Sequence, residues 1–399
     1  MARILFVWEL GLGFGHLSPY LEIVRALRSK GHEIIFAARD VENADRVFAR
    51  EGVPILQAPV SMRPVTNPYR ITFNYAQLMH NNGFAEVTDL FGRVKAWQHT
   101  YRYVRPDVMV FDHSPTGLLA SRVMDVKRVI SGSGFLIPPQ ESPLPLMRYW
   151  GEYDMDKIRK SEQRVLDTTN QVLQAFKRPP MKALSELFQA DAEWLISFSE
   201  LDHYPERKNG NYLGMFSLSD YGADPAWPAG KGKKIFCYLH PYKTMPGLLK
   251  VLNRSGATVL VHGPQIPDQV RKKFTSQRLR FSPKPLNVRR VGQECDLVIT
   301  NGTFGTTAAF LLAGKPVLMI PTNLERMMVA RRVVKMGAGL AAPQGKPQML
   351  LPRLKALLQN DRFAAAAREF SARYKDASLS SQTDQMLATI DKLVTPPAA

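Results

Sequence analysis

Two polar residues that follow apolar strand-like runs could do acid–base chemistry. His16 lies in the loop after the run at residues 3–8, and Asp112 directly follows the run at residues 107–111. An imidazole takes up a proton near neutral pH, and a carboxylate behind it can fix its tautomer and stabilise its charged form. Both residues are expected at the carboxyl edge of a parallel sheet, where ligands bind. The alternatives are that His16 closes a turn and that Asp112 caps the helix beginning near Pro115.

A turn rich in glycine and threonine could bind a phosphate. The apolar run 297–299 predicts a buried strand, the small residues 301–307 a turn, and residues 308–313 a helix that stops at Gly314. Free N–H groups and the positive end of a helix dipole suit an anion. From this segment alone, an ordinary connection between strand and helix explains the pattern equally well. The glycines before His16 do not form a dinucleotide fingerprint, because His16 stands in the place of the third glycine.

Segment 296–340 resembles the donor-binding motif of the UDP-glycosyltransferase-like superfamily, HGGxGTTxEALxxGxPxxxxPxxxDQxxNAxRxxxxGxG. The residues that match in register are Gly302, Gly305, Thr306, Thr307, Gly314, Pro316, Pro321, Ala330, Gly337 and Gly339. The chain departs from the motif at positions that contact the donor. Asn301 replaces the phosphate-contacting His, Ala309 replaces the Glu that holds the ribose, and Glu325-Arg326 replace the Asp-Gln that holds the sugar hydroxyls.

Three shorter stretches resemble other elements of the same superfamily. GHLSP at residues 15–19 resembles GHxxP, whose His is commonly the catalytic base, and PDVMVFDHSPTG at 106–117 is similar to the segment that often carries an Asp at the place of Asp112. FSPK at residues 281–284 resembles WxPQ, whose aromatic residue stacks on the nucleobase. Phe281 offers such a face and Lys284 departs from the usual Gln; a plain turn after a strand fits as well.

The resemblance implies a fold and an activity. The fold class is α/β of GT-B type, with two Rossmann-like domains whose parallel sheets face a central cleft. The activity is an inverting transfer of a hexose from a nucleoside-diphosphate sugar, UDP-sugar by default and dTDP-sugar as an option, to a hydroxyl acceptor. His16 would be the base and Asp112 its orienting partner. The donor-binding candidates are Phe281, Lys284, Asn301, Gly302, Thr303, Gly305, Thr306, Thr307, Glu325, Arg326 and, by position, His240.

The departures keep other interpretations open. With Asn301, Ala309 and Arg326 changed, the chain could be an inert sugar-nucleotide or glycan-binding protein of the same fold. Arg326 could meet a phosphate or an acidic sugar, or pair with Glu325 or Glu294. We expect no metal and no cofactor, since the chain has no Asp-x-Asp pair at a suitable position and dipoles can neutralise a diphosphate. The sequence does not identify the acceptor, which could be a lipid, glycan or small metabolite. It does not identify the donor sugar or the oligomeric state either.

The charge and composition of the chain limit the kinds of partner that we expect it to bind. The chain has 399 residues, the size of two α/β domains, and a formal charge of +18. Residues 271–290 contain no acid and could attract anionic lipid, nucleic acid or a diphosphate. A solvated basic surface explains the excess too, and without any nucleic-acid-binding motif a nucleic-acid partner is not expected. Peripheral association with an anionic membrane stays open.

The cysteines and the apolar runs of the chain indicate where in the cell it is located. Cys237 and Cys295 are too few for a disulfide framework or a zinc site, so we expect core residues in a reducing compartment. No apolar run reaches membrane length, and the start of the chain is too short for a signal segment. The expected location is cytoplasmic, with the inner face of the membrane as an option.

Strands and helices alternate along the chain in two similar cycles. We expect an acceptor-binding domain at 1–222, a linker at 223–233, a nucleotide-sugar-binding domain at 234–375, and a C-terminal helix and short tail at 376–399 that cross back to the first domain. Residues 138–190 break the rhythm with prolines and aromatics, and we interpret them as helical insertions that form a wall of the acceptor site.

Overall fold

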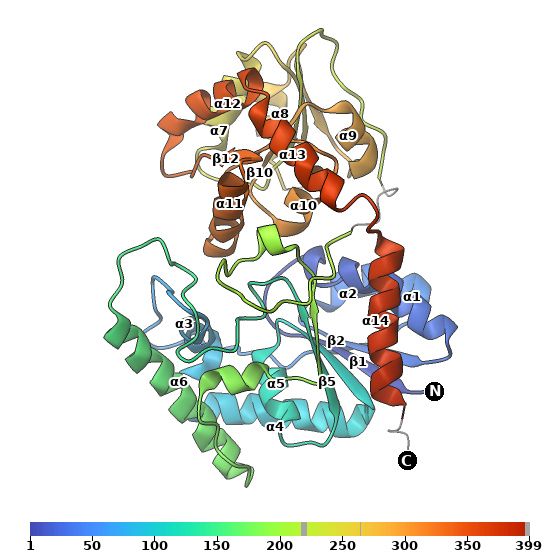
Figure 1. The fold of residues 1–399 in the computed structure, drawn as a ribbon, viewed down its shortest axis with the longest axis vertical. Coiled ribbons are helices and arrows are strands. Elements are labelled where there is room, and N and C mark those ends of the chain that lie inside the picture. The colour runs from blue at the N-terminus through green and yellow to red at the C-terminus, as the bar shows by residue number, and fades with distance from the viewer. Residues whose placement is uncertain (217–221, 264, 396–399) are drawn as a thin grey trace. The chain divides into compact units, whose positions relative to one another are not determined.

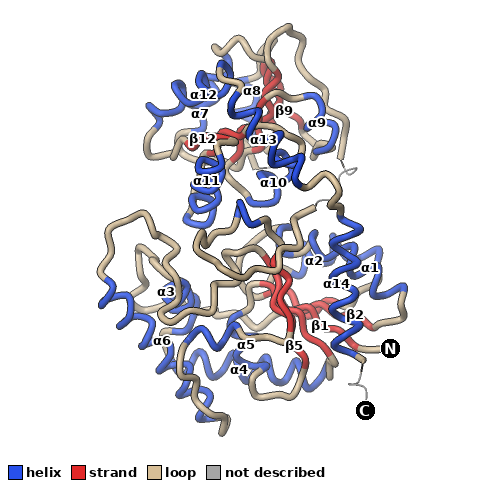
Figure 2. The backbone as a smooth tube through the Cα atoms, in the orientation of Figure 1, coloured by secondary structure: helices blue, strands red, loops and turns tan. Residues whose placement is uncertain are grey.

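The computed structural model describes residues 1–216, 222–263 and 265–395. Contacts divide the chain into two compact units, one built from residues 1–214 and 380–399 and the other from residues 215–379. Residues 217–221, in the turn-rich section before the expected linker, and the tail 396–399 lie outside the described residues. Figure 2 shows, for each unit, a sheet with helices packed around it.

The first unit is built on a parallel sheet with the strand order β3-β2-β1-β4-β5-β6, and Figure 1 labels β1, β2 and β5 of this sheet. Its strands are β1 (Arg3–Trp8), β2 (Glu33–Ala38), β3 (Ile55–Gln57), β4 (Val108–Asp112), β5 (Lys127–Gly132) and β6 (Ala192–Leu195). Its helices are α1 (Leu21–Ser29), α2 (Val41–Phe48), α3 (Tyr75–Met79), α4 (Val87–Val104), α5 (Pro115–Ser121), α6 (Met155–Ala175) and α14 (Leu379–Val394). The central strands are apolar on both faces because helices cover both sides of the sheet.

The second unit repeats the plan with the order β12-β11-β10-β7-β8-β9. Its strands are β7 (Lys234–Tyr238), β8 (Thr258–His262), β9 (Leu279–Ser282), β10 (Leu297–Thr300), β11 (Val317–Met319) and β12 (Gly339–Ala341). Its helices are α7 (Met245–Asn253), α8 (Asp268–Phe274), α9 (Val288–Glu294), α10 (Phe304–Leu312), α11 (Leu324–Met336), α12 (Leu350–Gln359) and α13 (Arg362–Arg373). Cys237 and Cys295 are buried core residues, as expected, and burial raises the pKa of the Cys295 thiol to about 12.

Both sheets have the strand order of dinucleotide-binding folds, in which the first and fourth strands lie side by side. The chain leaves these two strands in opposite lateral directions, and the loops beyond their carboxyl ends separate to leave a ligand crevice. Trp8 of β1 pairs with Asp112 of β4 at this point of the first unit. Tyr238 of β7 pairs with Thr300 of β10 at the same point of the second. The prediction of two Rossmann-like units with parallel sheets is confirmed.

Two local features differ from what the sequence predicted. Helix α10 begins at Phe304 and not near residue 308, so the threonine-rich part of the turn forms its first turn. Strand β5 was not predicted, because its exposed Lys127 and half-buried Arg128 interrupt the apolar pattern at its start.

The last helix, α14, packs on the first unit. Lys30, which follows α1, forms an ion pair with Asp391 at 2.6 Å, and the Gln382 amide donates to the Gly214 carbonyl at 3.1 Å. Met386 and Ile390 are buried on the same side of this helix. Among the described residues, no helix has the length and apolar character needed to span a membrane.

Candidate functional site

His16 and Asp112 are in direct contact. The imidazole Nδ1 lies 2.5 Å from Asp112 Oδ1, although the two residues are 96 positions apart in the chain. Asp112 is the last residue of β4, and His16 ends the loop that follows β1. The pairing of β1 with β4 therefore brings them together at the carboxyl edge of the sheet. The Asp112 side chain is only 5% exposed and that of His16 is 16% exposed, so the carboxylate is sheltered and the imidazole remains accessible.

A buried hydroxyl network holds the second oxygen of Asp112. Tyr20 donates to Asp112 Oδ2 at 2.6 Å and lies 2.8 Å from the Ser131 hydroxyl. Burial, together with the charge and the hydrogen bond of Asp112, raises the pKa of Tyr20 well above its usual value. The phenol consequently stays protonated and donates. Both carboxylate oxygens of Asp112 are engaged, which fixes the plane in which the carboxylate meets His16.

Asp112 does not cap α5. Glu9 caps this helix instead, because its Oε2 accepts hydrogen bonds from the Thr116 N–H at 3.0 Å and the Gly117 N–H at 3.3 Å. Burial raises the pKa of Glu9, and the nearby Arg93 guanidinium, 3.3 Å away, opposes the shift. The alternative interpretation of Asp112 as a helix cap is wrong, because another carboxylate already holds the first N–H groups of this helix.

Aromatic rings and a glycine fix the orientation of His16. Its ring stacks on Trp8 with centroids 5.2 Å apart and on His113 at 5.9 Å. Gly11 has a φ of +87°, and a Cβ at that position would lie only 2.3 Å from His16 Nε2. The loop can therefore hold the imidazole in this place only with glycine at residue 11.

His113 is a buried imidazole beside this pair. Neither of its ring nitrogens has a hydrogen-bond partner in the described part of the chain, and its backbone φ of +41° is unusual for a residue with a side chain. Burial, and then the neighbouring His16, lowers the pKa of His113 well below its usual value, and the Leu10 backbone opposes this only partly. The ring is neutral at physiological pH and adds no positive charge next to His16.

In the second unit, Asn301 follows β10 and joins the loops after the two strands on either side of it. Its side-chain oxygen accepts from the His240 N–H at 2.6 Å, and its side-chain nitrogen donates to the Ile320 carbonyl at 3.2 Å. The residue is fully buried. Asn301 thus ties the loops after β7 and β11 together. A contact from its amide to a donor phosphate stays a prediction, and these two bonds would have to change for it.

The first turn of α10 presents backbone N–H groups at the carboxyl edge of β10. Thr303 is the N-cap, and its hydroxyl is buried with no partner within the described residues. The Thr307 N–H and hydroxyl both donate to the Thr303 carbonyl, at 3.0 and 2.9 Å. The N–H groups of Gly305 and Thr306 come before the first N–H of the helical ladder and are therefore the ones suited to an anion. Gly302 has a φ of +86°, with Arg326 close to it.

Positive and titratable side chains gather beside this turn. Arg326, from the first turn of α11, donates to the Thr322 hydroxyl at 2.7 Å. Burial and then the charge of Arg326 lower the pKa of His240, and burial lowers the pKa of His262. The ring of Tyr238 lies 5.6 Å from that of His240 and 5.9 Å from that of His262. A negatively charged group would meet a guanidinium and two imidazoles here, and its approach would favour their protonated forms.

The remaining donor candidates lie at the same edge or near it. Phe281, in β9, packs partly against the core of the second unit, and Lys284 is exposed in the turn that follows. Glu325 precedes Arg326, and its charge raises the pKa of that arginine against the larger lowering effect of burial. Base stacking by Phe281 and the roles of Lys284 and Glu325 stay predictions. No group of three or more His, Cys, Asp or Glu residues that could hold a metal occurs among the described residues.

Several residues of the dyad's environment were not predicted. Tyr20, Ser131 and Trp8 contact the dyad, but each is a common residue in an ordinary apolar context. Glu9 carried a signal, since a carboxylate directly after an all-apolar strand has to be paired or capped when buried. Its partner, Arg93, comes from the middle of α4 and could not be identified without the fold.

Comparisons with known proteins agree on the architecture. No protein-family model matches the chain, and no curated protein sequence matches it. Solved structures do. The calicheamicin glycosyltransferase CalG4 aligns with a TM-score of 0.73 at 17% identity over 99% of each chain. The spinosyn rhamnosyltransferase SpnG complexed with thymidine diphosphate aligns with a TM-score of 0.67 at 18% identity, over 97% of this chain and 100% of its own.

The glycosyltransferase VinC in complex with dTDP gives a similar result, with a TM-score of 0.67 at 17% identity over 98% of this chain and all of its own. At this level of identity the likeness establishes the fold and not the reaction. Together with the two sheets of identical strand order, it shows that this chain has the GT-B fold of those glycosyltransferases.

Proposed function

We propose that this chain is an inverting, metal-independent glycosyltransferase that moves a hexose-type sugar from a nucleoside-diphosphate sugar to a hydroxyl acceptor. The observation that carries the proposal is the contact of 2.5 Å between His16 and Asp112 at the carboxyl edge of the first sheet. A buried carboxylate that is held by a tyrosine and touches one nitrogen of an accessible imidazole is the arrangement that a general base needs.

His16 takes the proton in the proposed step. With Nδ1 facing Asp112, the other ring nitrogen, Nε2, accepts the acceptor's hydroxyl proton as its oxygen attacks the anomeric carbon of the donor sugar. The bond from that carbon to the diphosphate oxygen breaks, and the diphosphate leaves with the electron pair. Attack from the face opposite the leaving group inverts the anomeric configuration. Asp112 stabilises the imidazolium that forms.

The second unit supplies the leaving-group side of the proposal. The N–H groups of Gly305 and Thr306, at the start of α10, would bind the diphosphate, and Arg326 and His240 would add positive charge. Because these groups can offset the diphosphate charge, we expect turnover to persist in a chelator. That the two edges face one cleft, as the sequence implies, stays a prediction.

The fold relatives bear on the nucleotide. SpnG and VinC were each solved with thymidine diphosphate, so a dTDP-sugar is as good a first choice as the UDP-sugar expected by default. SpnG was also solved with the spinosyn aglycone, a small-molecule acceptor. We therefore place a small hydroxylated metabolite first among the acceptors of this chain, ahead of a lipid or a glycan.

One observation favours a second function. Both ends of the Asn301 amide are used inside the protein, so the residue that stands in place of the family's phosphate-contacting His is not oriented toward a ligand. An inert sugar-nucleotide or glycan-binding protein of the same fold would show this feature as well. The two functions differ in whether binding leads to turnover that depends on His16.

A two-stage experiment tests the proposal. Thermal shifts of the full chain with UDP, dTDP and their sugars identify the donor, since at equal concentration a ligand that binds the folded state more tightly raises the melting temperature more. Transfer and donor hydrolysis are then assayed for wild type, His16→Ala and Asp112→Asn. We expect both variants to bind nucleotide normally and to lose about 100-fold or more in kcat, because each removes general-base catalysis.

The outcomes are distinct. Nucleotide binding without turnover in wild type, over a broad set of donors and acceptors, would support the inert protein. Turnover that survives in His16→Ala would overturn the assignment of the base but not the transferase activity. Absence of any nucleoside-diphosphate binding would overturn the transferase and the sugar-nucleotide-binding protein, and would leave the glycan-binding protein.

A further inference from the structure

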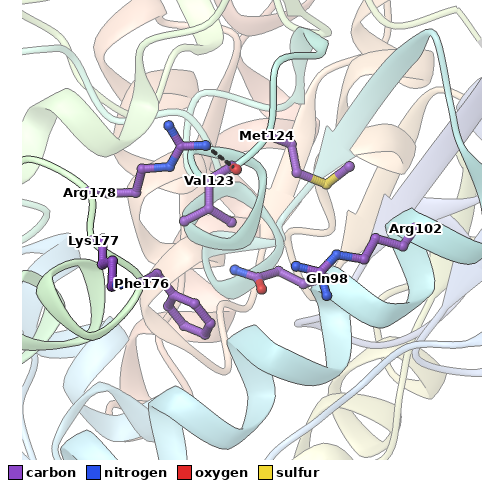
Figure 3. Close-up of a pocket in the computed structure, with 7 residues that line it drawn as sticks. All are labelled: Gln98, Arg102, Val123, Met124, Phe176, Lys177 and Arg178. Atoms are coloured by element: carbon purple, nitrogen blue, oxygen red, sulfur yellow. Dashed lines mark hydrogen bonds between the residues drawn. The ribbon is translucent and has the colours of Figure 1, made fainter.

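A cavity of about 280 Å³ lies in the first unit at the end of α5 that is remote from Asp112 (Figure 3). Helix α4 contributes Gln98 and Arg102, the turn after α5 contributes Val123 and Met124, and the turn after α6 contributes residues 176–178. Asp112 lies just before α5, whereas the cavity lies just beyond its last residue, so the two sites are separated by the length of this helix.

The charged side chains that line the cavity are all positive. They are Arg102, Lys177 and Arg178, and within the described residues none of them is paired with a carboxylate. Arg178 donates to the Val123 carbonyl at 2.5 Å, which holds its guanidinium against the wall (Figure 3). Many other cations of this chain do have acidic partners, such as Arg25 with Glu22. The cavity is thus a concentration of unneutralised positive charge.

A buried amide completes the cavity. Gln98 is only 3% exposed, yet its side-chain nitrogen has no hydrogen-bond partner in the described part of the chain. Buried polar groups are nearly always satisfied, so this amide calls for a partner that the chain itself does not supply. Because this nitrogen has almost no accessible surface, an acceptor oxygen in the cavity would meet it, together with the cations, once the Gln98 amide turns toward the cavity.

The backbone holds Lys177 in a conformation that favours glycine. Helix α6 ends in a Schellman motif, in which the Lys177 N–H donates to the Gln174 carbonyl at 2.8 Å and the Arg178 N–H to the Leu173 carbonyl at 2.9 Å. Lys177 occupies the left-handed position of this motif with a φ of +56°. Glycine is the usual residue there, so the lysine side chain is not required by the fold.

We propose that this cavity binds a phosphate group carried by a small metabolite or by a lipid headgroup. The three cations and the Gln98 amide would hold the phosphate oxygens, and the apolar side chains of Val123, Met124 and Phe176 would contact the attached carbons. Its volume is close to the lower end of small-molecule sites, about 300 Å³, and suits a compact ligand. The site does not depend on the proposed transferase activity.

The soluble form of the ligand is tested with glycerol 3-phosphate, and with glycerol as the uncharged control, by calorimetric titration of the full chain. We expect glycerol 3-phosphate alone to bind. Arg102→Gln and Lys177→Gly should each weaken binding about tenfold, since each removes a charge-assisted contact. Arg50→Gln removes an exposed cation elsewhere in the same unit and should leave the affinity unchanged.

The melting temperatures of the variants show whether a substitution changes the fold or only the site. Lys177→Gly should raise the melting temperature, or leave it unchanged, because glycine suits the left-handed position. Gln98→Leu should likewise not lower it, because the variant removes an unpaired buried amide, while phosphate binding is lost. A weakened affinity in variants that are as stable as wild type therefore reports on the site and not on unfolding.

The lipid source is tested by flotation with phosphatidylcholine vesicles, with and without phosphatidylglycerol. Binding only to the anionic vesicles, reduced by Lys177→Gly and not by Arg50→Gln, would identify a headgroup. Affinity for glycerol 3-phosphate that is lost in Arg326→Gln and kept in Arg102→Gln would overturn the proposal, because the probe would then sit in the second unit. Absence of binding in both arms would overturn it as well.

Discussion

The position of the His16 ring depends on residue 11 being glycine, which has a hydrogen atom where other residues have a Cβ. Gly11→Ala would place a methyl group 2.3 Å from His16 Nε2, so the ring has to move away from Asp112 or the loop has to shift. Productive geometry in active sites is sensitive to displacements of about 1 Å, which can cost about 100-fold. We expect Gly11→Ala to lower the transfer rate by about this factor.

Gly13 provides a matched control. Its φ of +86° is nearly that of Gly11, but a Cβ at Gly13 would meet nothing within 4 Å. Both alanine variants carry a backbone penalty of about 1–3 kcal/mol for their positive φ, which circular-dichroism melts should detect for each. Only Gly11→Ala should lower the rate beyond what the loss of folded protein explains. Equal rates in the two variants would show that this contact does not position His16.

His113 makes the stability of the first unit dependent on pH. Its pKa is lowered well below about 6.5 by burial in the folded state, whereas the unfolded chain has the ordinary value. Below pH 6.5 the unfolded state therefore binds more protons, and the free energy of unfolding falls as the pH falls. One histidine contributes up to about 1.4 kcal/mol per pH unit between the two pKa values.

His113→Asn should flatten this dependence. Asparagine tolerates the left-handed backbone at φ +41°, and it does not titrate. Urea unfolding at pH 7.5 and at pH 5.5 gives the free-energy difference for each protein, and we expect it to be smaller in the variant. His80, His240 and His262 also have lowered pKa values and keep their contributions in both proteins. An unchanged difference would mean that His113 is already protonated or exposed.

At the scale of single residues, the sequence predicted the pair but not its support. His16 and Asp112 each follow an apolar run that is easily interpreted as a strand, and strand ends of a parallel sheet meet at one edge. Tyr20 and Ser131 touch Asp112 because of side-chain directions that only the folded chain fixes. Asn301 fits the donor motif by position, yet its amide bonds to His240 and Ile320, which the motif does not indicate.

Among the elements, α5 depends on a carboxylate from another strand. Glu9, just after β1, accepts hydrogen bonds from the first N–H groups of α5 and lies 3.3 Å from the buried Arg93. Glu9→Ala leaves a buried guanidinium with fewer partners and uncaps the helix. We expect a loss of about 3–5 kcal/mol in the free energy of unfolding, measured by urea denaturation.

Glu42→Ala serves as the comparison. Glu42 also pairs with an arginine, Arg46, but both side chains are mostly exposed, at 74% and 63%. Exposed pairs one helical turn apart contribute about 0.3–0.5 kcal/mol, so this variant should unfold almost as wild type does. A Glu9→Ala variant no less stable than Glu42→Ala would show that α5 holds its place through apolar packing alone.

The elements that the sequence predicted well are those with strong apolar periodicity. Strands β1, β4 and β10 were placed within one residue, because their apolar runs are bounded by polar loops. The start of α10 was misplaced, since residues 304–307 are poor in strong helix formers, yet the helical ladder already begins with the hydrogen bond from the Thr307 N–H to the Thr303 carbonyl. Strand β5 starts with the exposed Lys127 and the half-buried Arg128, and its strand conformation depends on pairing with β4.

On the scale of the whole chain, the sequence predicted two similar cycles of alternating strands and helices. The structure contains two sheets with equivalent strand orders, one for each cycle. The repeat was visible because each half opens with an apolar strand, a polar loop and a helix. The limits of the units were less readable. The chain passes from the first unit to the second between residues 214 and 215, and it returns between residues 379 and 380. The composition at these two points does not mark a domain boundary.

The return of the chain to its first unit predicts that a change in the last helix is felt far away in sequence. Ile390, in α14, is fully buried among residues of the first unit, and replacing it with alanine should cost about 2–5 kcal/mol. Hydrogen exchange should then show weaker protection in β1 and β4, which are near the other end of the chain, and unchanged protection in β7 and β10. Lys392→Ala, at an exposed position of the same helix, should change neither set of strands. Equal weakening in all four strands would mean that the two units unfold as one cooperative body, because α14 would then stabilise both.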